Sequence, residues 1–174
     1  VVTYTAPPEA QTSTDYTVSA NGKPLVVYKD IHTDGDTKTR YFVNFSMSGT
    51  VTMNIKWALP FTAAIVQHRT MKITPTISNK TATFSFTGPR NISFESTDAG
   101  GNVNPENPAL YIFANPLEVN IPSPTDPAVE YFAPGYHNIG AYKMPKNRKM
   151  IYIAGGAYLN GKIRVDSMDN VLII

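Results

Sequence analysis

The last third of this 174-residue chain alternates short apolar segments with single glycines, and this pattern constrains the fold more than any other. It runs through residues 131–137, 151–163 and 171–174. Strand segments of this kind cannot bury both faces alone, so they need to stack against similar neighbours. We therefore expect the first rungs of a solenoid here, with later rungs beyond Ile174.

The residues before this pattern predict an all-β domain, because strand signals dominate and helical periodicity is nearly absent, even in 61–71. Asn21-Gly22 lies between two apolar segments and predicts a hairpin, since both residues tolerate the positive φ of a type I′ turn. Ser48-Gly49 predicts a second hairpin in the same way. We expect a mainly antiparallel, Ig-like β-sandwich. Its expected strands are 14–19, 24–28, 40–47, 50–57, 81–86, 91–95 and 110–114. Its core should include Val51, Met53, Ile55, Trp57, Phe84 and Phe86.

A proline-rich stretch separates the two patterns. Four prolines fall within 115–127, where they disfavour both a helix and a central strand. The predicted organisation is therefore a β-sandwich over 1–114, a linker over 115–128 and the start of the solenoid over 129–174. The expected solenoid strands are 129–132, 150–154, 157–163 and 171–174.

Composition excludes several classes of site and partner. The chain has no cysteine, which rules out disulfides, thiolate metal sites and a cysteine nucleophile. A net charge of +2 is too weak for a nucleic-acid-binding surface, and no apolar run approaches the roughly 20 residues of a membrane span. The first residue is Val1 rather than Met, from which we expect a processed or truncated N-terminus. One basic cluster predicts a solvated turn, or else a patch for anions or acidic glycans: Lys143, Lys146, Arg148 and Lys149.

The C-terminal motifs resemble a known family. Tyr-Phe-Ala-Pro-Gly-Tyr-His (131–137), Ile-Tyr-Ile-Ala-Gly-Gly-Ala (151–157) and Asn-Gly-Lys-Ile (160–163) look like the entry into a right-handed parallel β-helix. They are similar to the dextranase and isopullulanase group, glycoside hydrolase family 49, and to polygalacturonase-like β-helix hydrolases. Upstream, 88–95 and 110–116 resemble the end of that group's N-terminal β-sandwich. The resemblance implies a secreted polysaccharide hydrolase whose catalytic carboxylates lie on later coils, after Ile174.

The polar clusters give no catalytic or metal site. Asp30, His32, Asp34 and Asp36 miss the spacing of a calcium loop and predict a turn. The three histidines, His32, His68 and His137, lack ligand spacing. Glu95 with Asp98, or Asp166 with Asp169, could form a glycosidase acid/base pair, but sequence neighbours on short loops rarely face each other across a cleft. We expect no catalytic residue, metal or cofactor in this chain.

Aromatic side chains are the remaining candidates. Trp57 shares its strand face with apolar residues, so we expect it in the core rather than under a sugar. Five tyrosines lie within 131–158. Packing at a domain junction is one interpretation of them, and sugar stacking is the other. Under the second interpretation the carbohydrate-binding candidates are Tyr131, Tyr136 and Tyr142.

These observations predict the N-terminal accessory part of a secreted, periplasmic or cell-surface glycoside hydrolase. Its partner would be a polysaccharide, reached through the parent enzyme, and the chain alone would be inactive. The alternatives are a stand-alone carbohydrate-binding or adhesion module, and a purely structural surface domain. The uncharged apolar run Val171–Ile174 further predicts self-association through 150–174.

Overall fold

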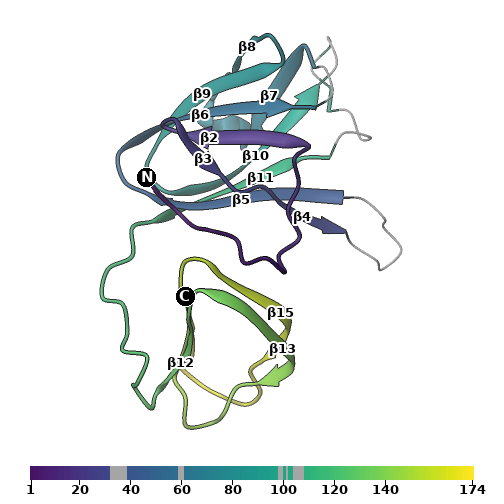
Figure 1. Ribbon diagram of the computed structural model, residues 1–174. Coiled ribbons are helices and arrows are strands. Elements are labelled where there is room, and N and C mark those ends of the chain that lie inside the picture. The colour runs from purple at the N-terminus through teal and green to yellow at the C-terminus, as the bar shows by residue number, and fades with distance from the viewer. Residues whose placement is uncertain (32–38, 59–60, 98–99, 101, 104–107) are drawn as a thin grey trace. The chain divides into compact units, whose positions relative to one another are not determined.

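The computed structural model describes residues 1–31, 39–58, 61–97, 100, 102–103 and 108–174. The chain divides into two compact units (Figure 1). The first unit comprises Val1–Tyr4 and Gln11–Leu117, and the second comprises Thr5–Ala10 and Glu118–Ile174. Within the described ranges, the one helical element is a short 3₁₀ turn, η1 (Arg69–Met71), and the other elements are strands.

A six-stranded sheet forms one layer of the first unit (Figure 1). Its strands follow the order β1-β5-β11-β10-β7, and β4 also pairs with β5. The pairs are antiparallel except for β5 and β11, which run parallel from Leu110 opposite Tyr41 to Pro116 opposite Met47. The strands are β1 (Val2–Thr3), β4 (Tyr28–Ile31), β5 (Thr39–Met47), β7 (Ala63–Gln67), β10 (Arg90–Thr97) and β11 (Leu110–Pro116).

An antiparallel five-stranded sheet forms the other layer, in the order β3-β2-β6-β9-β8. The β2–β3 hairpin turns at Asn21 and Gly22, whose φ angles of 50° and 76° confirm the predicted hairpin. The strands are β2 (Tyr16–Ala20), β3 (Lys23–Leu25), β6 (Thr50–Trp57), β8 (Thr76–Ser78) and β9 (Thr81–Thr87).

The two sheets of the first unit share one hydrophobic core. Along β6, buried and less buried residues alternate, as expected for a strand with one face in the core. The six residues predicted for the core all lie in it, with at most 5% of their surface exposed: Val51, Met53, Ile55, Trp57, Phe84 and Phe86. The predicted alternation around Trp57 is therefore confirmed.

One expectation for the first unit is wrong, and two features were not expected. Ser48-Gly49 does not close a hairpin, because β5 lies in the six-stranded sheet and β6 lies in the other. The turn instead carries the chain from one layer to the next. The parallel β5–β11 pair was also not expected, and the segment 61–71, which gave no strand signal, contains β7 and η1.

The second unit is built from parallel strands. β12 (Val129–Phe132), β14 (Met150–Ile153) and β16 (Leu172–Ile173) form one parallel sheet, and β13 (Gly135–Lys143) pairs in parallel with β15 (Ala157–Arg164). The register advances by about 22 residues from each strand to its neighbour. Phe132, Met144 and Ile151 are buried in a cluster to which side chains of β13 and β15 also contribute. The chain is thus all-β, with antiparallel sheets and small parallel sheets.

The proline-rich segment connects the units with little regular structure. β11 continues to Pro116, two residues into the predicted linker. After it, Arg148 donates hydrogen bonds from Nη1 to the carbonyl oxygens of Asp126, Pro127 and Val129. The end of the linker is therefore tied to the turn that precedes β14, within the second unit.

Candidate functional site

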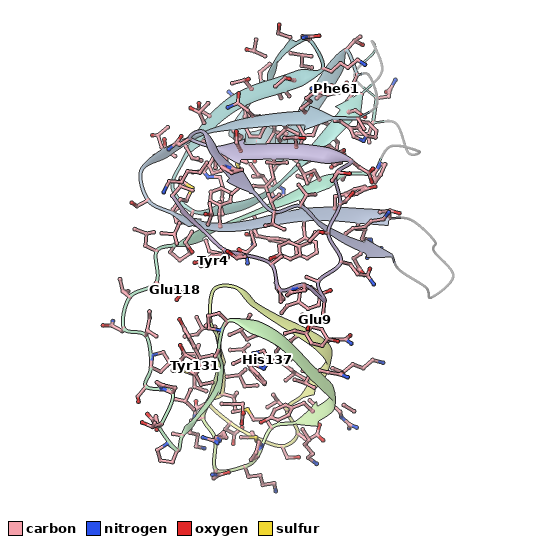
Figure 2. The ribbon with its side chains drawn as sticks, in the orientation of Figure 1. Tyr4, Glu9, Phe61, Glu118, Tyr131 and His137 are labelled. Carbon is pink, nitrogen blue, oxygen red and sulfur yellow. The ribbon has the colours of Figure 1, made fainter. Side chains whose placement is uncertain are left out.

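Tyr131 lies on one face of the β12–β14 sheet. Its ring centroid is 5.0 Å from that of Tyr152 on β14, with the ring planes tilted by 33°. The same face buries Val129 and Tyr152, and the Tyr152 hydroxyl donates to the Glu118 carboxylate. Figure 2 labels both Tyr131 and Glu118 on this unit. Tyr131 therefore contributes to the packing of this face.

Tyr142, on β13, packs against the other face of the β12–β14 sheet. Its ring meets Phe132 edge-on at 5.9 Å, and its hydroxyl donates to Glu130 Oε2 at 2.6 Å. Burial, followed by the hydrogen bond to Glu130, raises the pKa of Tyr142 to about 12. Arg148 Nε lies 3.5 Å from the same carboxylate oxygen. These contacts give Tyr142 a structural role.

Tyr136 faces away from the interior of the second unit. The adjacent His137 lies toward that interior (Figure 2), where its ring meets Phe132 edge-on at 5.4 Å. Alternation along β13 therefore directs Tyr136 outward. Its ring stacks on Tyr158 of β15 at 6.0 Å and 22°, and Asn160 Nδ2 donates to its hydroxyl at 2.9 Å. The three predicted sugar-stacking tyrosines thus occupy three different environments and do not form one platform. Their role in carbohydrate binding stays a prediction.

A second aromatic group, which sequence reasoning missed, lies on the outer face of the six-stranded sheet. There a cavity of about 350 Å³ is lined by Asp30, Arg40, Phe42, Tyr111 and Phe113. The outward alternation of Tyr111 and Phe113 between buried neighbours in β11 was the signal that could have revealed it.

A carboxylate with two hydroxyl donors lies at the edge of the first unit's core. Asp15 Oδ2 accepts from Tyr41 at 2.5 Å and from Ser13 Oγ at 2.8 Å. These two hydrogen bonds lower the pKa of Asp15, while burial and the Asp15 contact raise that of Tyr41 to about 12. Tyr16 stacks on Trp57 at 5.4 Å and 10° beside them. The group supports the core of the first unit.

Several acidic and histidine candidates make other contacts or lie outside the described residues, whereas His68 and Asp169 are exposed. Glu95 accepts from Ser93 Oγ at 2.7 Å, and Asp166 pairs with Lys143 and Arg164. His137 Nε2 is 2.7 Å from the Ala133 carbonyl oxygen. The part of the chain that the structure describes has no group of three or more His, Cys, Asp or Glu side chains able to hold a metal ion. His32, Asp34, Asp36 and Asp98 lie outside it.

The basic cluster is partly used within the fold. Arg148 binds Glu130 and three carbonyl oxygens, and Lys143 lies 3.2 Å from Asp166. These contacts favour the interpretation of the basic cluster as a turn over its interpretation as an anion-binding patch. No helix in the described ranges is long and apolar enough to cross a membrane.

Comparison with known proteins gives a match in structure. No protein-family model matches the chain, and no curated protein matches it in sequence. Among solved structures it is similar to Dex49A from Penicillium minioluteum, with a TM-score of 0.69 and 16% sequence identity. The match covers 92% of this chain and 44% of Dex49A, so the chain spans less than half of that protein's length. Dex49A is a dextranase of glycoside hydrolase family 49, so the predicted resemblance is confirmed at the level of the fold.

Proposed function

We propose that this chain is the N-terminal accessory part of a secreted polysaccharide-degrading glycoside hydrolase of the dextranase type. The observation that carries the proposal is the structural match to Dex49A over 92% of this chain and only 44% of that one. A chain that shares nearly all of its own fold with part of a larger protein fits a supporting region of such a protein.

The arrangement of strands supports the finer architecture. Two sheets around one core are what an Ig-like β-sandwich requires. The parallel registers that repeat about every 22 residues in the second unit are what the first rungs of a right-handed parallel β-helix require. In this proposal the sandwich supports the β-helix, whose later rungs form the substrate groove.

The charged side chains of this chain support placing catalysis elsewhere. A glycosidase needs two carboxyl groups about 5–9.5 Å apart across a cleft. Asp166 is held by two cations and Glu95 by a neighbouring serine. We therefore assign the catalytic carboxylates to residues after Ile174, and the polysaccharide is the partner of the whole enzyme outside the cell.

The test compares this chain with the complete protein encoded by its gene. Both are incubated with dextran, pullulan and polygalacturonate, and reducing ends are measured. We expect turnover by the complete protein and none by residues 1–174. Reproducible turnover by pure 1–174 would overturn the placement of the catalytic groups. A complete protein with no turnover on any of the three would overturn the hydrolase assignment.

A stand-alone carbohydrate-binding or adhesion module is the second candidate function. The aromatic cavity on the six-stranded sheet favours it, since such modules hold glycans on exposed rings. In that case the complete protein would bind a polysaccharide without releasing reducing ends.

A further inference from the structure

The residues that line the cavity on the outer face of the six-stranded sheet are not part of the first unit's core cluster. The cavity lies over β4, β5 and β11 and has a volume of about 350 Å³, within the usual range of small-ligand sites. We propose that it binds a neutral saccharide, whose apolar ring faces stack on Phe42, Tyr111 and Phe113.

The aromatic rings of the cavity are exposed by the pleat of β11. Leu110 and Ile112 are fully buried in the core, whereas Tyr111 and Phe113 keep 41% and 37% of their surface exposed. Tyr111 is opposite Phe42 in the parallel β5–β11 register. The two outward rings gather with Phe42 on one face of the sheet rather than occurring singly.

The rings are held in place before any ligand arrives. Phe42 stacks on Tyr28 at 5.0 Å with the planes 14° apart, and it meets Phe113 edge-on at 6.1 Å. These contacts fix Phe42 between two neighbours on the sheet. The Phe42 side chain therefore loses little conformational entropy when a ligand binds, which lowers the free-energy cost of binding.

The polar groups of the cavity suit hydroxyls rather than a charged ligand. Asp30 and Arg40 are opposite each other in the β4–β5 register, so the formal charges of the lining residues that the structure describes cancel. Together they offer acceptors and donors for vicinal hydroxyl groups. Asn44, opposite Phe113 on the same sheet, accepts a hydrogen bond from Asn115 Nδ2 at 2.6 Å and extends this polar border.

A saccharide combines apolar ring faces with hydroxyl groups, and this cavity places aromatic rings beside an acidic and a basic side chain, which is the basis for proposing a saccharide. The existence of the site follows from these side chains. The choice of α-glucan oligosaccharides as test ligands, by contrast, rests on the proposed function.

The test uses the 174-residue chain and isothermal titration calorimetry with isomaltohexaose and maltohexaose, with an oligogalacturonide as the charged comparison. Tyr111→Ala and Phe113→Ala should each weaken binding by about tenfold or more, the scale of one lost aromatic contact. Tyr111→Phe keeps the ring and should bind like the parent. Tyr136→Ala tests the separate carbohydrate-binding prediction for the second unit. Val119→Ala, at a 78% exposed apolar position of the linker, is the control and should bind like the parent. Circular dichroism confirms that each variant is folded.

Binding of either neutral oligosaccharide that is lost in Tyr111→Ala and kept in Val119→Ala supports the site. Binding of maltohexaose alone keeps the site and counts against a dextran-type substrate. No binding of either neutral oligosaccharide, preference for the oligogalacturonide, or loss only in Tyr136→Ala overturns it. Variants that change only the association state of the chain would indicate a protein contact and also overturn it. None of these results alters the reducing-end assay of the complete protein, so the two proposals can fail separately.

Discussion

Gly161 is paired with Gly140 between β15 and β13, and a β-carbon on Gly161 would lie 2.3 Å from the Gly140 carbonyl oxygen. Gly161 also has a φ of +144°, which side chains rarely adopt. Gly161→Ala should therefore lower the free energy of unfolding of the second unit by about 3–5 kcal/mol, from backbone strain and overpacking together. Amide hydrogen exchange across 135–164 measures the loss of protection.

Gly135→Ala is the control for this substitution. Gly135 has a φ of +125°, but nothing lies within 4 Å of its added β-carbon. It should show only the strain component, about 1–3 kcal/mol. Equal effects of the two substitutions would contradict the steric part of the argument.

Trp57→Ala should remove a ring that is only 4% exposed and stacked on Tyr16. We expect a loss of about 3–5 kcal/mol, typical of a buried aromatic replaced by alanine. A denaturant titration followed by circular dichroism measures it. Phe113→Ala, at a 37% exposed ring, should cost much less, and an unchanged midpoint for Trp57→Ala would place this ring outside the core.

The Asp15 carboxylate should make the first unit sensitive to acid. Its pKa lies below the ordinary value of 3.8, chiefly because Tyr41 donates to it. A lowered folded-state pKa stabilises the fold above the unfolded value, and this stabilisation is lost as the pH falls through the lower folded value. Asp15→Asn should flatten the dependence of unfolding free energy on pH in this acid range. An unchanged slope between the parent and Asp15→Asn would contradict the assignment.

Tyr41 and Tyr142 should titrate late in alkali. The pKa of each is raised from 10.0 to about 12, with burial as the largest cause in both. Their contributions to stability are complete below pH 10.0 and are lost as the pH rises through about 12. Tyr41→Phe and Tyr142→Phe should each remove one late step from a tyrosinate absorbance titration. A profile identical to the parent's would show that the replaced hydroxyl ionises normally.

Self-association through 150–174 stays a prediction, and the exposed residues of β16 and the C-terminal Ile174 give it a test. Leu172, Ile173 and Ile174 keep 49%, 53% and 56% of their surface exposed. A strand edge with apolar side chains favours pairing with another chain, and lysine on such an edge opposes it. We expect light scattering to detect oligomers of 1–174 that Leu172→Lys disperses. Val119→Lys, at a 78% exposed apolar position of the linker, is the control and should leave them intact. A monodisperse monomeric parent would contradict the prediction.

The predictions from sequence succeeded where the signal was local. Asn21-Gly22 determines its hairpin through the φ angles of two adjacent residues, and the alternation in β6 determines which face is buried. Ser48-Gly49 gives a similar sequence signal, but only Gly49 has a positive φ, and the turn joins two layers because β5 pairs with β11 from far along the chain. No short-range pattern reports such a pairing.

A change of register along β13 separates two of the predicted tyrosines. Tyr136 and Tyr142 are six residues apart, an even spacing that would place them on one face of a regular strand. The register shift between Asn138 and Gly140 inserts an extra residue, so the later part of β13 presents the opposite side chains inward. A bulge of this kind depends on the neighbouring strand, and glycine content alone does not locate it.

The parallel pairing of β11 with β5 has a consequence for how the first unit forms. β11 is the last strand of its sheet along the chain, yet it lies between β5 and β10 in the strand order. During synthesis, the sheet therefore remains split until Pro116 has left the ribosome. Contacts between residues so distant in sequence also slow folding. We infer that the nascent first unit exposes open strand edges for a longer time than a sandwich of consecutive hairpins would. The nascent chain is most prone to aggregate during this interval.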